Sequence, residues 1–106
     1  MYACLDMGGT NLRGTWIDAY GNRGEVLSRS RPRSLEGTEN ALLQLIANIR
    51  ESAPEEVRRV GLGSAGPLDH RSGCYLQPSN MPELEYFPVA EFVQQQTGLP
   101  LLLEND

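Results

Sequence analysis

Polar and apolar residues follow a period of two near the start of the chain and a helical period further on. Residues 2–7 are apolar apart from one carboxylate, and residues 12–17 alternate loosely, so each stretch predicts a β-strand. Residues 26–31 predict a third strand, which Pro32 ends. Polar, glycine-rich turns separate these strands, and this spacing predicts an antiparallel meander.

Two helices and two further strands are predicted after the meander. Thr38 is a suitable N-cap for the first helix. The apolar stripe of that helix, assigned to the core rather than to a partner surface, comprises Leu42, Leu45, Ile46, Ile49 and Ala53. The second helix is predicted from Pro88 to its C-cap, Gly98. Strands are predicted at residues 57–64 and 99–103, and the second is apolar throughout, as is typical of a central strand covered on both faces.

The resulting order of elements is βββαβαβ. Strands joined by a helix pair in parallel through right-handed crossovers, so this order predicts an α/β fold with a mixed sheet and helices on its faces. The 106 residues predict one domain. No stretch is apolar for long enough to cross a membrane, and no signal peptide opens the chain, so we expect no membrane partner.

The net charge of −5 and the two isolated cysteines narrow the classes of partner and compartment. Nucleic acids bind basic surfaces, so this acidic chain predicts no nucleic-acid partner. Cys4 and Cys74 fit neither a metal-binding nor a redox spacing, which predicts a reduced, cytoplasmic setting. Arg29, Arg31 and Arg33 alternate and should share one face of a strand, where we favour a solvated edge over an anion site.

The glycine turn between the first two strands has the chemistry of a phosphate site. Gly8 and Gly9 let a ligand approach the backbone, and Thr10 adds a hydroxyl. Asp6 precedes the turn in a stretch that is expected to be buried, where a carboxylate has no evident structural task. Free amides, a hydroxyl and a carboxylate directed at a hydrated cation form a phosphate cradle, and the alternative is a plain hairpin. The turn is not the lysine-dependent P-loop, because all 9 basic residues are arginine.

Residues 61–66 spell G-x-G-x-x-G, the fingerprint of dinucleotide-binding folds. That fingerprint must open a helix, but Pro67 and turn-forming residues follow it here. We therefore interpret the segment as a glycine-lined wall beside a small polar ligand or as a strand that packs closely. His70, in the turn that follows, is assigned no role. Asn80 lies between two prolines and could hydrogen-bond either its own turn or a ligand hydroxyl.

Three segments, taken in order, resemble the ROK family of bacterial sugar kinases and sugar-responsive repressors. They are residues 5–11 (Leu-Asp-Met-Gly-Gly-Thr-Asn), residues 61–69, and residues 78–82 followed by 97–100 and 104–106. The family belongs to the actin-like ATPase superfamily. The resemblance therefore implies an RNase H-like lobe with the strand and helix order given above.

The resemblance also implies roles for the matching residues in a kinase that uses ATP and Mg²⁺ to phosphorylate a hexose. Asp6 would hold the magnesium ion through water. The ATP- and phosphate-binding residues would be Asp6, Gly8, Gly9, Thr10 and Asn11. The sugar-binding residues would be Gly66, Asn80 and Asn105. Asp106 would be the catalytic base, which accepts the proton of the sugar hydroxyl as its oxygen attacks the γ-phosphorus.

The chain stops directly after an apolar strand. We therefore expect residues 1–106 to be the N-terminal lobe of a longer, two-lobed kinase, inactive by itself and forming a homo-oligomer through exposed apolar surface. The family's histidine-bearing sugar motif, its zinc site and the adenine-binding half would lie beyond Asp106. Only Met1 precedes the first strand, which favours a kinase over a repressor. One alternative is a sugar-sensing regulator. Another is an assembly protein of the actin-like superfamily, and the sugar-side residues, 64–67 and Asn80, argue against that second alternative.

Overall fold

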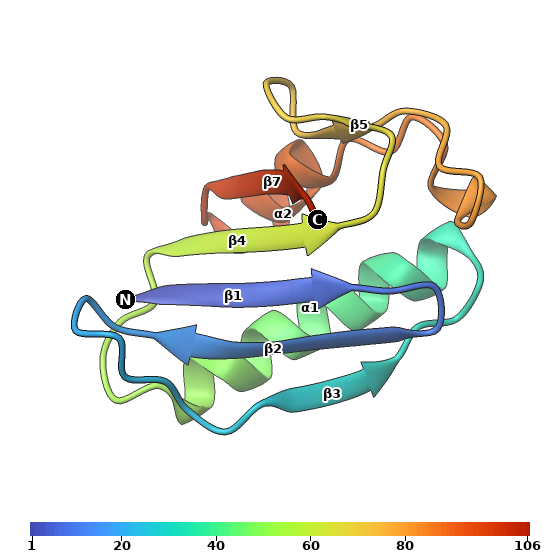
Figure 1. The fold of residues 1–106 in the computed structure, drawn as a ribbon. Helices are drawn as coiled ribbons and strands as arrows, with labels where there is room; N and C mark the ends of the chain where they lie inside the picture. Colours follow the sequence, from blue (N-terminus) through green and yellow to red (C-terminus); the bar gives the residue numbers. More distant parts are fainter.

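The computed structural model describes residues 1–106 and contains a five-stranded sheet, a two-stranded hairpin and two α-helices (Figure 1). In chain order the elements are β1 (Tyr2–Met7), β2 (Asn11–Ile17), β3 (Leu27–Ser30), α1 (Leu35–Ser52), β4 (Arg59–Ser64), β5 (Leu68–Asp69), β6 (Cys74–Tyr75), a 3-10 helix (Pro82–Leu84), α2 (Val89–Thr97) and β7 (Leu101–Asn105). The predicted βββαβαβ order is confirmed for the main sheet, and the β5–β6 hairpin is inserted between β4 and α2. None of the helices combines the length and the apolar composition that a membrane span requires.

Both helices cover the same face of the main sheet. The strand order is β3-β2-β1-β4-β7, with an antiparallel β1–β2–β3 meander and with β1, β4 and β7 parallel. The connections through α1 and then through α2 both lead toward β7, and right-handed crossovers in one direction place their helices on one side. Figure 1 shows α1 and α2 behind the sheet. The other face, called the open face below, carries no helix.

Helix α1 begins earlier than predicted because Ser34, not Thr38, is its N-cap. The Ser34 hydroxyl accepts a hydrogen bond from the Gly37 amide at 3.0 Å. Thr38 is buried in the first turn, where its hydroxyl donates to the Ser34 carbonyl at 2.8 Å. Serine and threonine are both favoured as N-caps, so local sequence does not separate the two candidates. The predicted core stripe is confirmed by the burial of Leu42, Leu45, Ile46 and Ile49.

The last strand, β7, lies at the edge of the sheet and not at its centre. Leu103 is fully buried, whereas Leu102 is 52% exposed on the open face. Three consecutive leucines suggested burial on both sides, but α2 packs on only one side of this strand. The αL conformation of Gly98, with φ of 77°, ends α2 as predicted and turns the chain into β7.

Candidate functional site

The carboxyl-terminal ends of β1, β4 and β7 meet at one end of the sheet, which is where open α/β sheets bind ligands. Asp6 on β1 is in register with Gly63 on β4. Ser64 is in register with Asn105 on β7, and the backbone amide of Asp106 donates to the Ser64 carbonyl at 2.9 Å. The fold therefore brings Asp6 and Asp106, from opposite ends of the chain, to the neighbourhood of Gly63.

Two glycines leave room for the last two side chains of the chain. A Cβ atom at position 63 would lie 2.8 Å from Asp106 Oδ1. A Cβ atom at position 66 would lie 3.3 Å from Asn105 Oδ1 and 2.9 Å from the Leu68 amide nitrogen. Gly66 and Asn105, both predicted to bind sugar, are thus adjacent in space. Gly63 was not singled out from the sequence, where it is one of several glycines in the G-x-G-x-x-G run.

The glycine turn between β1 and β2 borders a hollow of about 310 Å³ on the protein surface. The hollow is lined by Asp6, Gly8, Gly9, Thr10, Asn11, Arg13 and Ser28. The Gly8 amide is not free, because it donates to the Asn11 carbonyl at 2.8 Å and closes the turn. The amides of Gly9 and Thr10 donate to no group of the chain. The turn therefore offers two free amides beside the Thr10 hydroxyl, which is the chemistry of an anion-binding concavity.

Asp6 is exposed, and the expectation that it is buried was wrong. Its side chain is 53% exposed and lies 3.5 Å from the guanidinium of Arg13, its cross-strand neighbour. An ion pair this exposed contributes little to stability. Asp6 points to the open face because residues of β1 alternate between the helix-covered side and the bare side. An exposed single carboxylate beside a turn with free amides has the chemistry that suits a hydrated Mg²⁺, which takes few protein ligands and keeps several waters.

Arg31 is buried and hydrogen-bonds the glycine turn from the interior of the protein. The expectation that this arginine lies on a solvated strand edge was therefore wrong. Its side chain is fully buried. Nε donates to the Gly8 carbonyl at 2.9 Å and Nη2 to the Gly9 carbonyl at 2.7 Å. Nη1 donates to Thr38 Oγ1 at 2.9 Å and to Glu83 Oε2 at 3.0 Å. The sequence contains no signal for this role, since alternation of Arg29, Arg31 and Arg33 describes a face but not what covers it.

Glu83 is the only carboxylate that pairs with Arg31. It lies in the 3-10 helix that follows the loop of residues 77–81, which carries Asn80. Burial alone would raise the pKa of the Glu83 carboxyl. Its own backbone amide and the hydrogen bond and charge of Arg31 outweigh burial, so the pKa is lowered from its ordinary value of 4.5.

The side chain of Asn80 is exposed and makes no hydrogen bond within the chain, either to its own turn or to Gly66 or Asn105. The loop of residues 77–81 is nevertheless linked to the glycine turn, because Glu83 follows it directly and pairs with Arg31. The G-x-G-x-x-G segment runs into β5 and not into a helix, as predicted from Pro67.

Tyr75 places a buried hydroxyl near the site. Its oxygen has no hydrogen-bond partner, and the neighbouring Ser64 hydroxyl donates to the Ala65 carbonyl at 3.1 Å instead. Burial raises the pKa of Tyr75 to about 12, with Ser64 and the Arg31 charge opposing the shift and Asp106 adding to it. His70, to which no role was assigned, has Nδ1 2.9 Å from the Leu103 carbonyl and ties the hairpin to β7.

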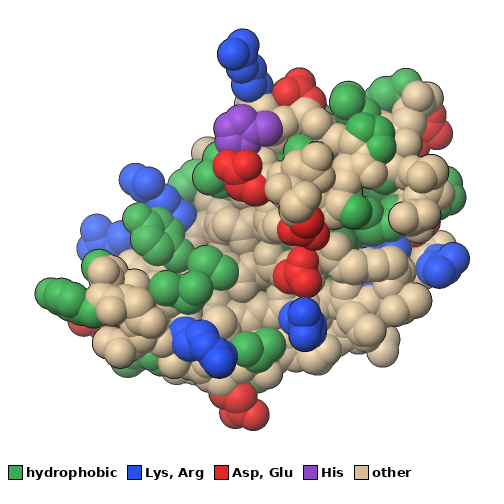
Figure 2. Space-filling view, viewed as in Figure 1, with side chains coloured by type: hydrophobic (Ala, Val, Ile, Leu, Met, Phe, Trp, Pro, Cys, Tyr) green, Lys and Arg blue, Asp and Glu red, His purple; other side chains and the backbone are tan.

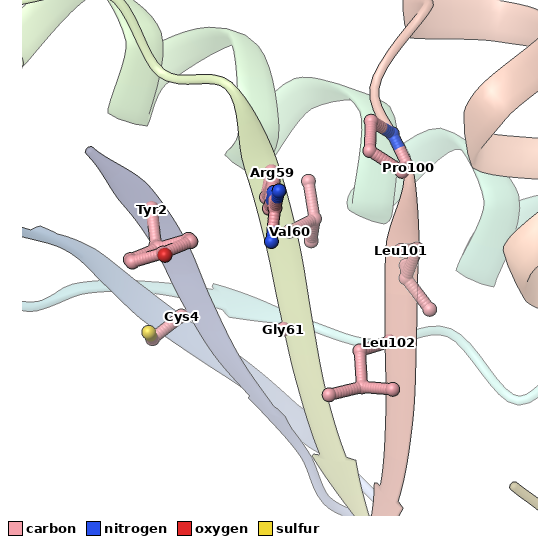
Figure 3. A pocket seen from close by; sticks show the side chains of 8 residues that line it. All are labelled: Tyr2, Cys4, Arg59, Val60, Gly61, Pro100, Leu101 and Leu102. Carbon is pink, nitrogen blue, oxygen red and sulfur yellow. The ribbon is translucent and has the colours of Figure 1, made fainter.

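Another hollow lies on the open face but away from the predicted site. It has a volume of about 620 Å³ and is lined by Tyr2, Cys4, Arg59, Val60, Gly61, Pro100, Leu101 and Leu102 (Figure 3). Apart from Pro100, which precedes β7, these residues come from the amino-terminal halves of β1, β4 and β7, opposite the end that carries Asp6 and Asp106. Figure 2 shows apolar side chains over this end and acidic side chains toward the other.

The sequence matches the model of the ROK family over residues 2–106. It is 30% identical over 102 residues to an N-acetylmannosamine kinase of Salmonella newport, a match that covers 96% of this chain and 34% of the relative. The chain thus spans about a third of the length of the curated relatives that it matches.

Solved structures of sugar kinases have the same fold. A ROK family glucokinase from Streptomyces griseus, in complex with glucose and AMPPNP, aligns with a TM-score of 0.88 at 28% identity, over 98% of this chain and 32% of that one. A ROK hexokinase from Thermus thermophilus aligns with a TM-score of 0.87 at 30% identity, over 98% of this chain and 34% of that one.

Proposed function

This chain belongs to the ROK family, and on that premise we propose that residues 1–106 are the N-terminal lobe of an ATP-dependent hexose kinase resembling bacterial glucokinase. The relatives named above are sugar kinases, and one was solved with glucose and an ATP analogue. The observation that carries the proposal is the meeting of Asp6, the glycine turn and Asp106 at the carboxyl ends of β1 and β7, the two strands that flank β4.

The phosphate side of the reaction is assigned to the glycine turn. The free amides of Gly9 and Thr10 would donate to phosphate oxygens, and Asn11 and the Gly8 backbone would line the same hollow. Asp6 would hold Mg²⁺ through water, and the ion would neutralise charge that develops on the transferred phosphoryl group. Phosphoryl transfer depends mainly on positioning and on charge stabilisation, and this set of groups supplies both.

The sugar side is assigned to the ends of β4 and β7. Asp106 would accept the proton of the attacking hydroxyl, and its backbone bond to Ser64 fixes its position beside Gly63. Asn105 would bind a sugar hydroxyl against Gly66, with Asn80 approaching from its loop. The substrate is proposed to be glucose or a related, N-acetylated hexose, since relatives act on sugars of both kinds.

A second lobe is part of the proposal, because one lobe offers half of a cleft. The chain spans about a third of its curated relatives, and the groups that hold adenine, any zinc ion and the remaining sugar hydroxyls would come from the rest of the protein. Residues 1–106 alone are therefore proposed to have no kinase activity, and the whole protein is proposed to be a homo-oligomer.

The test is a coupled ADP-release assay on the full-length product of the gene, with Mg²⁺, ATP and a panel of hexoses that includes N-acetylated ones. Residues 1–106 alone serve as the control for activity that needs both lobes. Sugar-dependent turnover by the full-length protein only is the expected result. Sugar binding by calorimetry without turnover would replace the kinase by a sugar-sensing regulator.

A further inference from the structure

We propose that Arg31 is a positioning residue for phosphate transfer, which holds the glycine turn with its free amides outward and couples it to the loop of residues 77–81 through Glu83. This inference rests on the proposed kinase function and deepens it. Arg31 would touch neither nucleotide nor sugar, because its side chain is fully buried beneath the turn.

Three successive carbonyls of the turn accept hydrogen bonds from this one residue. The side chain donates to the carbonyls of Gly8 and Gly9 at 2.9 and 2.7 Å. The backbone amide of Arg31 donates to the carbonyl of Thr10 at 2.8 Å. Bonds from an ionised donor are stronger than neutral ones, so the side-chain contacts are the firmest that hold the turn.

The carbonyls that Arg31 holds belong to the same peptide planes as the free amides. In a planar trans peptide, the C=O of one residue and the N–H of the next point in opposite directions. The Gly8 carbonyl is thus opposed to the Gly9 amide, and the Gly9 carbonyl to the Thr10 amide. Because Arg31 fixes both carbonyls toward the interior, it fixes both amides toward the hollow, where they have no partner within the chain.

A flexible glycine pair needs such an anchor. Gly8 and Gly9 have the widest conformational freedom of any residues, so the turn would otherwise sample orientations in which its amides diverge. The guanidinium suits the task because it is planar and presents several donors in a fixed fork, whereas a lysine ammonium is a single point donor. Its Nη1 group donates to Thr38 and Glu83, so the buried charge is paired with a carboxylate.

Glu83 extends the effect to the sugar side. It follows the loop that carries Asn80 and lies in the 3-10 helix of residues 82–84. Its carboxylate meets the same Nη1 atom that bonds Thr38, at 3.0 Å. A shift of this loop on sugar binding would therefore act on the guanidinium that orients the phosphate turn. The structure offers no other ion pair between the loop region and the turn.

The test compares Arg31→Leu, Arg31→Lys and Glu83→Gln in the full-length gene product with Arg33→Leu as the matched control. Arg33 is exposed and donates no hydrogen bond, yet its charge also lowers the pKa of Glu83, so it controls for charge without anchoring. Turnover gives kcat and KM for MgATP and for sugar. Calorimetry with Mg-AMPPNP measures nucleotide binding without turnover, and ¹⁵N-labelled residues 1–106 report the Gly9 and Thr10 amide shifts.

We expect Arg31→Leu to weaken AMPPNP binding and to raise KM for MgATP by at least about tenfold. A tenfold change corresponds to the free energy of about one charge-assisted hydrogen bond. Arg31→Lys should fall between it and the wild type, and Arg33→Leu should stay within about twofold. The Gly9 and Thr10 amide signals should move in Arg31→Leu and not in Arg33→Leu. Glu83→Gln should raise KM for sugar and for MgATP together.

Three outcomes would overturn the inference. One is nucleotide binding by Arg31→Leu and Arg31→Lys equal to that of the wild type. Another is an equal loss for sugar and nucleotide with unmoved Gly9 and Thr10 amides in the folded Arg31→Lys protein, as expected of a purely structural arginine. The third is a wild type that binds no AMPPNP. Arg31-dependent AMPPNP binding without sugar turnover would instead sustain the inference and reject the proposed kinase.

Discussion

Gly63 and Asp106 occupy one space: a Cβ atom on the glycine would lie 2.8 Å from Oδ1 of the aspartate. Real Cβ atoms do not approach an oxygen so closely, so a side chain at position 63 and the observed carboxylate position exclude each other. The observed position of the Asp106 carboxylate, the proposed base, therefore requires a residue without a side chain at position 63 of β4.

Gly63→Ala should lower kcat of the full-length protein by about tenfold to a hundredfold, because the proposed base, Asp106, would be displaced from the sugar hydroxyl. Gly61→Ala is the matched control, since a Cβ at that position on the same strand meets nothing within 4 Å. Steady-state kinetics on both variants measure the effect. Equal kcat values for the two variants would contradict the assigned position of Asp106.

Tyr75→Phe should leave the protein as stable as the wild type or raise the free energy of unfolding by about 1 kcal/mol, because it removes a buried hydroxyl that has no partner. Tyr75→Leu is the contrast: it also removes a ring stacked on Phe87 at 6.4 Å and should cost about 3 kcal/mol. Urea unfolding of each variant measures both changes. A cost above about 1 kcal/mol for Tyr75→Phe would mean that the hydroxyl is bonded.

The Glu83 carboxylate should make the free energy of unfolding decrease as the pH falls into the acid range. Its pKa in the folded protein is lowered from 4.5, so its contribution is fully present above that value and is lost as the pH falls through the folded-state pKa. The difference in unfolding free energy between wild type and Glu83→Gln should therefore be largest near about pH 7 and shrink below about pH 4. Urea titrations across this range decide, and a difference independent of pH would contradict the ion pair with Arg31.

Residues 1–106 alone should self-associate through the open face. Leu102 is 52% and Tyr2 44% exposed there, beside the apolar hollow of Figure 3. Leu102→Glu should shift the chain toward monomer in sedimentation velocity runs. Leu35→Glu, a leucine 39% exposed at the start of α1, is the control and should leave association unchanged. Sedimentation of the wild-type chain as a monomer would contradict the prediction.

Local sequence was sufficient to predict the strands and helices of the main sheet and the glycine turn between β1 and β2. Alternation along residues 2–7 and 12–17, with two glycines between, describes a hairpin whatever surrounds it. Local sequence was not sufficient to predict which side chains of these strands are exposed to solvent. Alternation says that Asp6 shares a face with its second neighbours, but which face stays bare depends on both crossovers leading toward β7.

The burial of Arg31 is a second property that local sequence could not predict. A charged residue at the end of an edge strand is usually solvated, and only the tertiary fold carries Glu83 and Thr38 to its guanidinium. Likewise, the position of β7 at the edge follows from strand order and not from its leucines. Short-range signals thus located the candidate groups, and long-range packing determined which of them are held, exposed or paired.

Asp106 is proposed to be the base of a hexose kinase, and kcat of Asp106→Asn in the full-length protein on its best sugar tests that assignment. Glu104→Gln, two residues earlier and paired with His70, is the matched control. We predict a fall in kcat of at least about a hundredfold for Asp106→Asn, with AMPPNP binding retained, and a change within about twofold for the control. Near-wild-type turnover by Asp106→Asn would contradict the claim.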